Sequence, residues 1–317
     1  MRVVFLGTPG FALSSLRALI ESQYEVAAVF TQPDRPSGRG QRLQPPPVKL
    51  LALEHNVPVY QPERIRSEEN RALFEKLRPD FIAVAAFGQI LPAWLLQAAA
   101  VATVNVHASL LPRYRGAAPV IWALLNGDTV TGVTTMLMDE HLDTGPILLK
   151  SEVPLSDTIT AGELESRLAE SGARLLIETL DRLRSGTLRP EPQDDTQATL
   201  APRIKKEMAR IDWSKSARDI HNMVRAFNPW PLAFSEFNNQ RIQIVRSLPE
   251  AGGAGRSMRG TFLGATRDGM RVQCGNGTVL ELIQVQPASK RPVTGREFAI
   301  GARLTPNEVV FGTSAQP

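Results

Sequence analysis

The chain has 317 residues, of which 43% are hydrophobic and 21% charged, values typical of a globular chain long enough for about two domains. Its apolar runs are too short for a membrane-spanning helix or a signal peptide, and the single cysteine, Cys274, excludes an internal disulfide, so we expect a cytoplasmic protein. Basic residues outnumber acidic ones only after residue 188, which indicates either a polyanionic partner or an ordinary solvated surface.

Strand and helix patterns alternate in the first half of the chain. Short apolar runs predict strands at residues 2–6, 25–31, 81–86 and 102–107. Helical spacing of apolar residues predicts helices at residues 11–21, 48–55, 67–77 and 160–184, and Ser67 is the expected N-cap of the third. Two more strands, residues 132–138 and 147–153, are joined by a loop rather than by a helix. The alternation predicts an α/β fold with a Rossmann-like, doubly wound parallel sheet.

The second half has a different pattern of predicted elements. It begins with a polar, proline-containing linker at residues 189–207. One helix is expected at residues 216–227. Short strands follow at residues 232–237, 241–247, 260–265, 270–273 and 279–285, separated in places by hairpin-type turns such as Asn238-Asn239 and Gly275-Asn276-Gly277. We therefore expect a catalytic domain over residues 1–188, a linker over residues 189–207, and a small OB-like β-barrel domain over residues 208–317.

Several familiar kinds of site are disfavoured by the sequence. Gly7-Thr8-Pro9-Gly10 follows the first strand but lacks the third glycine of a dinucleotide-binding loop, and its proline removes a backbone N–H donor. The segment therefore indicates a tight turn rather than a nicotinamide site. Neither a P-loop sequence nor a G-x-S-x-G nucleophile elbow occurs. The histidines have no metal-pair spacing with one another or with Cys274, so no metal is expected.

Polar side chains gather where the strand at residues 102–107 ends. Asn105 and His107 stand two positions apart and therefore on one face of that strand. In an open α/β sheet, ligands bind beyond the carboxyl ends of the strands. A turn-rich loop, residues 109–119, follows directly, and Asp143 lies in a second polar loop, between the two strands that no helix joins. These positions predict a site composed of an amide, an imidazole and a carboxylate.

Such a site suits attack on a carbonyl carbon. The Asn105 N–H and a protonated His107 can hold negative charge on the carbonyl oxygen, an effect worth about 10²–10³ in rate per donor in known enzymes. Asp143 can keep His107 charged or accept the proton of an attacking amine. None of the three is a strong nucleophile, so direct acyl transfer is favoured. Strand-end histidines and Asp-Thr-Gly turns also occur for purely structural reasons, and spacing alone leaves both interpretations open.

Longer motifs surround these residues. Residues 105–112 read NVHASLLP, residues 113–119 read RYRGAAP, and residues 142–145 read LDTG. They resemble the signatures of the formyltetrahydrofolate-dependent formyltransferase family. Shorter segments at residues 30–36, 38–40 and 226–231 extend the resemblance over the whole chain.

The resemblance implies a Rossmann-like catalytic domain, an OB-like second domain, and 10-formyltetrahydrofolate as the formyl donor. The chain is similar to those members of the family that formylate the α-amino group of methionine on initiator methionyl-tRNA for translation initiation, and a monomer is expected. By motif match, the residues expected to be catalytic are Asn105, His107 and Asp143. The residues expected to bind the folate are Ser109, Leu110, Leu111 and Pro112, with the leucine pair on the pterin and backbone groups pairing with its edges.

The resemblance also implies a role for the basic loop at residues 34–47. The matching loop in the family is an insertion that enters the tRNA acceptor end, so Arg39 and Arg42 are expected to bind tRNA through its phosphates. Without the resemblance, a solvated basic loop is the simpler interpretation. Two positions depart from the family pattern: Gly10 stands where an acidic residue is usual, and His141 stands where a small residue is usual. We expect His141 to point to solvent.

Two other functions stay open from the sequence. The same chemistry could act on a sugar nucleotide or a purine precursor, against which the basic second domain and the arginine loop argue. A non-catalytic RNA-binding protein could have kept the fold, against which the intact Asn105, His107 and Asp143 argue. The residues do not decide whether His107 or Asp143 accepts the proton of the attacking amine.

Overall fold

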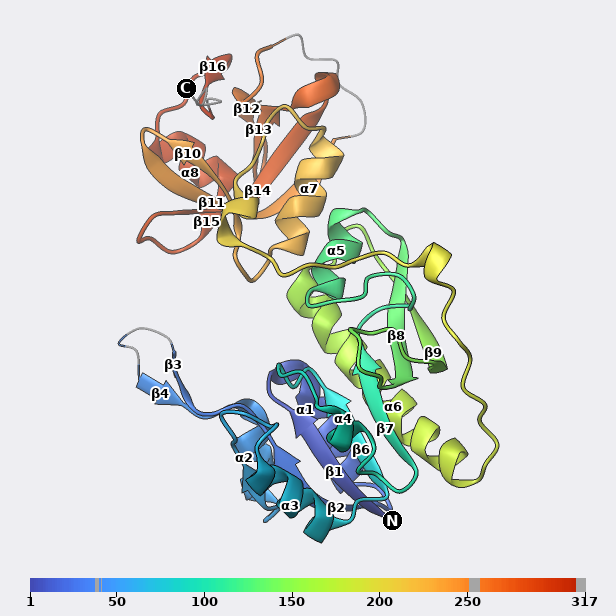
Figure 1. The fold of residues 1–317 in the computed structure, drawn as a ribbon. Helices are drawn as coiled ribbons and strands as arrows, with labels where there is room; N and C mark the ends of the chain where they lie inside the picture. The colour runs from blue at the N-terminus through green and yellow to red at the C-terminus, as the bar shows by residue number, and fades with distance from the viewer. Residues whose placement is uncertain (38–39, 41, 251–256, 312–317) are drawn as a thin grey trace. The chain divides into compact units, whose positions relative to one another are not determined.

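The computed structural model describes residues 1–37, 40, 42–250 and 257–311, and its internal contacts divide the chain into two units (Figure 1). The first unit comprises Met1–Pro119, Val130–Pro154 and Glu165–Pro202. The second comprises Val120–Thr129, Leu155–Leu164 and Arg203–Pro317. Two short segments of the N-terminal half therefore pack with the C-terminal unit. The division at residues 188 and 207 drawn from the sequence stays a prediction.

A seven-stranded mixed sheet forms the centre of the first unit, in the order β5-β2-β1-β6-β7-β8-β9. The parallel strands are β1 (Arg2–Gly7), β2 (Glu25–Phe30), β5 (Val59–Tyr60), β6 (Phe81–Ala85) and β7 (Ala102–His107). The antiparallel edge consists of β8 (Val130–Leu137) and β9 (Ile147–Pro154). The predicted α/β fold is confirmed, but the sheet is mixed rather than wholly parallel. A connection without a crossover helix can join β8 to β9 only as antiparallel neighbours.

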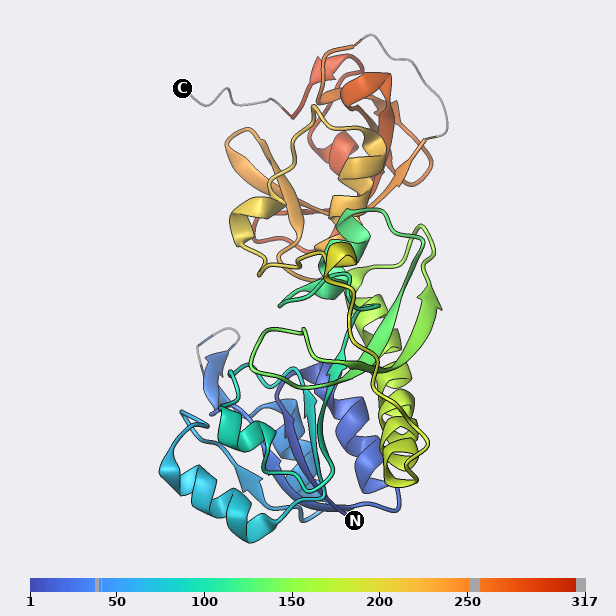
Figure 2. The same cartoon turned by 45° about the vertical axis from the view of Figure 1, so that its right-hand side comes forward.

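Helices cover both faces of this sheet (Figure 1 and Figure 2). They are α1 (Gly10–Ile20), α2 (Pro47–Glu54), α3 (Glu68–Leu77), α4 (Ala93–Leu96) and α6 (Ala161–Arg184). On one face, Phe74 of α3 and Leu95 of α4 share a buried apolar cluster with strands β1, β2 and β6. On the other, α6 approaches so closely that a Cβ on its Gly172 would lie 2.8 Å from Val106 of β7. The predicted N-cap is also found, since Ser67 Oγ accepts from Asn70 N–H at 3.4 Å.

An antiparallel sheet forms the second unit. Its strand order is β10 (Ala233–Phe237), β11 (Gln240–Pro249), β14 (Val279–Pro287), β13 (Met270–Gln273), β12 (Thr261–Ala265) and β16 (Glu308–Val309), with β15 (Val293–Thr294) beside β14. The helices of this unit are α5 (Pro119–Leu125), α7 (Ala217–Ala226) and α8 (Gly295–Gly301). In the described residues, the edge strands β10 and β16 do not pair with each other. The expected OB-like barrel is therefore an antiparallel half-barrel.

The turns of the second unit follow from local chemistry. Asn238 and Asn239 have φ values of 48° and 59°, the left-handed pair that a tight hairpin between β10 and β11 requires. Trp213 is the largest fully buried side chain; it stacks on Phe311 at 5.0 Å, and its Nε1–H donates to Ser235 Oγ at 2.9 Å. The core of this unit is thus organised around one aromatic side chain whose polar atom is satisfied. No helix in the described part of the chain is long and apolar enough to cross a membrane.

Candidate active site

Asn105 and His107 lie on β7, between β6 and β8, at the carboxyl end of the parallel strands. Asn105 is 9% exposed and His107 6% exposed. Asn105 pairs in register with Val84 of β6 on one side and with Met136 of β8 on the other, so its backbone position is set from both sides. The two side chains share one face of the sheet because strand residues alternate with a period of two.

The His107 ring lies between a backbone carbonyl and a carboxylate. Its Nε2 lies 3.0 Å from the Tyr114 carbonyl oxygen, and its Nδ1 lies 3.6 Å from Oδ1 of Asp143. A carbonyl oxygen can only accept, so Nε2 carries a proton and donates it. Nδ1 then faces the carboxylate oxygen at a distance longer than a hydrogen bond. The arrangement places an imidazole nitrogen and a carboxylate side by side at the edge of the sheet.

Asp143 reaches His107 from the loop between β8 and β9. Its φ of 56° is left-handed, a conformation that aspartate tolerates better than most residues. The second carboxylate oxygen, Oδ2, accepts from Gly116 N–H at 2.9 Å, and the side chain is 12% exposed. Both oxygens are therefore directed, one at a backbone donor and one at the histidine. His141, two residues earlier, is exposed, as expected from the sequence.

The side-chain amide of Asn105 is the third polar group of the site. In the described part of the chain it makes no hydrogen bond, although the residue is 9% exposed. Buried amides are almost always paired within the protein or with a bound molecule. The Asn105 N–H is therefore available as a donor to a bound substrate oxygen.

The segment from Ser109 to Pro112 only partly fits the expected folate contacts. Leu111 is 0% exposed and packs with Met136 and Ile147, so its side chain cannot touch a ligand in this conformation. The Oγ1 of Thr134 donates to the Ser109 carbonyl at 2.7 Å and accepts from Leu111 N–H at 3.1 Å, which uses backbone groups that were expected to face the pterin. Leu110 keeps a partly exposed side chain.

A loop that sequence reasoning did not assign lies beside this site. Because Val84 pairs with Asn105, the loop over residues 86–91 begins next to the Asn105 position. Ala86 and Gly88 have φ values of 48° and 85°, and Ile90 leaves its side chain 77% exposed. The apolar sequence directly after a buried central strand is the signal that could have identified it. The loop can offer an apolar wall at the ligand-binding edge of the sheet.

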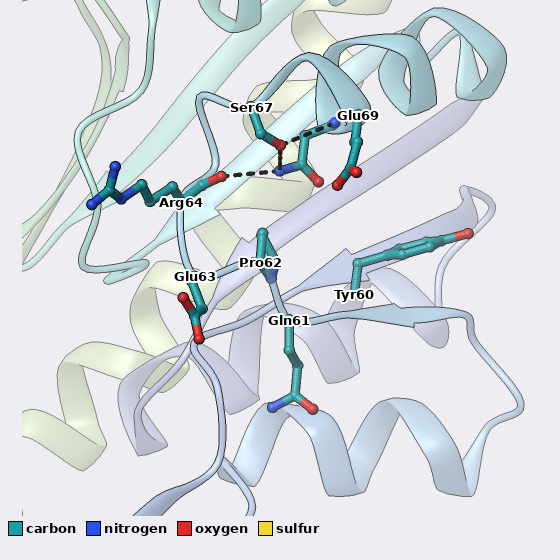
Figure 3. Close-up of a pocket in the computed structure, with 8 residues that line it drawn as sticks. Tyr60, Gln61, Pro62, Glu63, Arg64, Ser67 and Glu69 are labelled. Carbon is teal, nitrogen blue, oxygen red and sulfur yellow. Dashed lines mark hydrogen bonds between the residues drawn. The ribbon is translucent and has the colours of Figure 1, made fainter.

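A pocket of about 460 Å³ lies elsewhere in the first unit, lined by residues 60–64, 67, 69 and 70 (Figure 3). Its polar groups serve the turn that leads into α3, since Asn70 Nδ2 donates to the Arg64 carbonyl at 3.1 Å and to Ser67 Oγ at 2.8 Å. None of its lining residues belongs to the Asn105, His107 and Asp143 cluster.

The basic loop after β2 contains a hairpin where the sequence predicted irregular structure. β3 (Arg35–Ser37) pairs with β4 (Arg42–Gln44). At its base, the Asp34 carboxylate accepts from Gln61 Nε2 at 2.7 Å and from Lys49 Nζ at 2.9 Å, and these donors lower the pKa of Asp34. Arg42 is exposed on β4, whereas Arg39 lies outside the described residues. In the described residues no group of three histidine, cysteine or acidic side chains could hold a metal ion.

Comparison with known proteins finds two family matches along the chain. Residues 1–180 match the formyl transferase family, and residues 203–303 match the formyl transferase C-terminal domain. The methionyl-tRNA formyltransferase of Trichlorobacter lovleyi is 47% identical over 314 residues, which is 97% of this chain and 98% of that protein. That of Acetivibrio thermocellus is 46% identical over 311 residues, or 98% and 99% of the two chains.

Solved structures share the fold at much lower identity. WlaRD, a sugar 3N-formyl transferase crystallised in the presence of dTDP and 5-N-formyl-THF, has a TM-score of 0.67 and 19% identity, covering 92% of this chain and 99% of its own. HypX from Aquifex aeolicus in complex with tetrahydrofolic acid has a TM-score of 0.62 and 18% identity, covering 94% of this chain and 47% of its own. At these identities the similarity shows the fold alone.

Proposed function

This chain belongs to the formyl transferase family, among methionyl-tRNA formyltransferases, and we propose from that premise how its residues carry out the reaction. It transfers a formyl group from 10-formyltetrahydrofolate to the α-amino group of methionine on initiator methionyl-tRNA, which gives N-formylmethionyl-tRNA for translation initiation. The observation that carries the assignment of the catalytic residues is the 3.6 Å contact from His107 Nδ1 to Asp143 Oδ1, beside Asn105, on the ligand-binding edge of the sheet.

The first step forms a carbon–nitrogen bond. The lone pair of the methionine amine attacks the formyl carbon, and the carbonyl π electrons move to the formyl oxygen. Asn105 donates its amide N–H to that oxygen, and protonated His107 donates from Nδ1, because Nε2 is occupied by the Tyr114 carbonyl. Donors preorganised toward developing charge are commonly the largest single contribution to catalysis.

The second step returns the donor to tetrahydrofolate. The new ammonium group gives a proton to Oδ1 of Asp143, which is the carboxylate oxygen not held by Gly116 N–H. The oxyanion re-forms the carbonyl, the bond from the formyl carbon to N10 breaks, and N10 takes the proton of His107 Nδ1. Asp143 then passes its proton to His107. One hydrogen has moved from the amine to N10, and the pair is restored.

Both substrates have candidate binding segments in the chain. The Ser109 to Pro112 segment contributes to the folate site through the Leu110 side chain and through backbone groups not used by Thr134, together with the exposed Ile90 of the neighbouring loop. Arg39 and Arg42 bind the phosphates of the tRNA acceptor end. The protein is proposed to act as a monomer, and a cytoplasmic location suits the single buried thiol of Cys274.

Transfer of labelled formyl tests this proposal. The purified chain is incubated with 10-[¹⁴C]formyltetrahydrofolate and, in parallel, with methionyl initiator tRNA, methionyl elongator tRNA, an amino-sugar nucleotide or free methionine. Label is expected on the initiator methionyl-tRNA. Label on the sugar nucleotide or free amine alone would overturn the acceptor, and no label on any amine would overturn the activity.

A further inference from the structure

A buried arginine and a glutamine connect the loop after β7 to the loop that carries Asp143. Arg115 is 8% exposed; its Nε and Nη2 donate to Gln193 Oε1 at 3.0 and 2.8 Å, and Nη2 also pairs with Asp195 Oδ1 at 2.7 Å. Resting on the proposed function, we propose that Arg115 and Gln193 are positioning residues for formyl transfer, which hold the Asp143 carboxylate at His107. Neither was a candidate from the sequence, where Gln193 stands in the expected linker.

Gln193 holds the backbone of the Asp143 loop. Its Nε2 donates to the carbonyl oxygens of Asp143 at 2.9 Å and of Gly145 at 2.8 Å. The orientation of the amide is unambiguous, because the guanidinium can only donate and the two carbonyls can only accept. Every polar atom of the side chain is thereby used, and the backbone on both sides of Thr144 is fixed to one group. The left-handed φ of Asp143, 56°, is a conformation that needs such support.

Three consecutive residues, 114–116, make the contacts that hold His107 and the Asp143 loop. Tyr114 accepts from His107 Nε2 through its carbonyl, Arg115 holds Gln193, and Gly116 N–H donates to Asp143 Oδ2 at 2.9 Å. One short segment therefore contacts both members of the His107 and Asp143 pair. A shift of Arg115 would change the position of His107's acceptor and of Asp143's donor together.

A strap formed by residues 190–201 fixes that segment from outside; it follows α6 in the chain and runs past β9 (Figure 1). Arg115 N–H donates to the Thr199 carbonyl at 2.8 Å, and Ala201 N–H donates to the Arg115 carbonyl at 2.7 Å. At Gly116, whose φ is +126°, an added Cβ would lie 2.8 Å from the Ala201 carbonyl oxygen. Only glycine permits this approach. The strap therefore holds the segment whose Tyr114 carbonyl and Gly116 N–H contact His107 and Asp143.

A purely structural role predicts a different response to substitution. If Gln193 serves only as one of the two partners of the buried guanidinium, beside Asp195, its loss would destabilise the chain whatever the chain's function. Gln193→Glu separates the two roles. The carboxylate still accepts from Arg115 and adds an opposite charge, but it replaces the two N–H donors with an oxygen that faces two carbonyl oxygens. The Asp143 loop should move while the arginine stays paired.

The first experiment compares Gln193→Glu with the wild-type chain in formyl transfer to initiator methionyl-tRNA. We expect kcat to fall by about 10- to 100-fold, the loss typical of a catalytic group displaced by about 1 Å. KM for both substrates should stay within about threefold, because neither substrate is held by Gln193. The matched control is Gln97→Glu, the same change on an exposed glutamine of the first unit outside the strap. Its kcat should equal that of the wild type.

The second experiment repeats the change in an Asp143→Asn background under single-turnover conditions. If Gln193 acts through Asp143, Gln193→Glu should alter the residual rate by less than about twofold there, because residues that act as a unit are not additive. Any of three results would overturn the inference. The first is the same fold loss of rate in both backgrounds, and the second is a wild-type rate for Gln193→Glu. The third is a fall in Tm that accounts for the lost activity. A wild-type chain that transfers no formyl group would instead overturn the proposed function, and this role with it.

Discussion

Two buried histidines, one in each unit, differ in the group that faces their second ring nitrogen. His221 of α7 is 3% exposed; its Nε2–H donates to the Asp157 carbonyl at 2.7 Å, and its Nδ1 accepts from Ser247 Oγ at 3.2 Å. His107 has the same carbonyl acceptor on Nε2, but its Nδ1 faces the Asp143 carboxylate.

The difference lies in the second nitrogen. A neutral imidazole satisfies both partners of His221, and burial, with Arg225 and Arg218 nearby, lowers the pKa of that histidine. For His107, Nδ1 faces a carboxylate oxygen at 3.6 Å instead of a hydroxyl group. Two histidines of nearly equal burial therefore differ in the group that faces Nδ1, and the proposed mechanism gives a proton-carrying role to His107 alone. The predictions below test this contrast, from the largest expected effect to the smallest.

The largest effect is expected at His107. His107→Ala removes the proton carrier, and general acid–base groups contribute about 10²–10⁴-fold to rate, so kcat/KM for formyl transfer should fall by that amount. Binding of initiator methionyl-tRNA, measured by filter retention, should stay near the wild-type level. His141→Ala, at an exposed histidine, is the control. An unaffected rate in His107→Ala would remove the catalytic assignment.

Asn105→Ala should have the next largest effect. Loss of one oxyanion donor costs about 10²–10³ in kcat, and KM should change little because the interaction strengthens only in the transition state. Steady-state kinetics with varied folate and tRNA would separate the two parameters. A raised KM with an unchanged kcat would make Asn105 a ground-state binding residue instead.

His221→Leu should act on stability and not on chemistry. It leaves the Asp157 carbonyl and the Ser247 hydroxyl without their partner, which costs about 1–3 kcal/mol of unfolding free energy for buried polar groups. Urea unfolding measures the loss, and kcat measured below the unfolding range should stay within about twofold of the wild type. A loss of rate comparable to that of His107→Ala would erase the contrast.

The same residue should make stability depend on pH. Because the folded pKa of His221 is lowered, the unfolded chain binds a proton that the folded chain does not. Its contribution is therefore fully present above the ordinary histidine pKa of about 6.5 and is lost as the pH falls below it. His221→Gln, which can still donate to the Asp157 carbonyl, should flatten this slope in urea unfolding between about pH 7 and pH 5. An unchanged slope would assign the dependence to other groups.

The smallest effect is expected at the hairpin. Arg42→Ala should weaken binding of initiator methionyl-tRNA and make the plot of log affinity against log salt shallower by about one phosphate contact. Arg71→Ala, at an arginine that pairs with Glu75 on α3, is the control because it removes the same charge elsewhere in the first unit. Equal salt slopes in the two variants would indicate that the hairpin is a solvated basic surface that does not bind tRNA.

Local patterns predicted much of the fold. The N-cap at Ser67, the left-handed turn at Asn238 and Asn239, and the placement of Asn105 and His107 on one strand face all depend on neighbours within a few residues. The antiparallel pairing of β8 with β9 could have been deduced from the missing crossover helix, but the reversal of β8 against β7, across a connection that contains α5, could not. The short hairpin of β3 and β4 was missed because strands of three residues have no readable period.

Contacts between distant residues were beyond local patterns. The sequence carries both His107 and Asp143, but their 3.6 Å approach depends on β8 and β9 placing one loop beside the end of β7. The burial of Leu111 against Met136 and Ile147 could not be predicted either, because the side a loop leucine buries depends on neighbours distant in the chain.

The sequence by itself determined the chemical groups of this protein: an amide, an imidazole and a carboxylate in motifs of one enzyme family, and the alternation that makes a mostly parallel sheet. Only the tertiary structure decided which nitrogen of His107 faces the carboxylate, and that a strap expected to be a linker holds the backbone of Asp143 through Gln193. The physical reason is the separation along the chain over which each kind of interaction acts. Propensity and periodicity act between neighbours in the chain, whereas hydrogen bonds and proton sharing act between atoms that folding brings within about 3–4 Å.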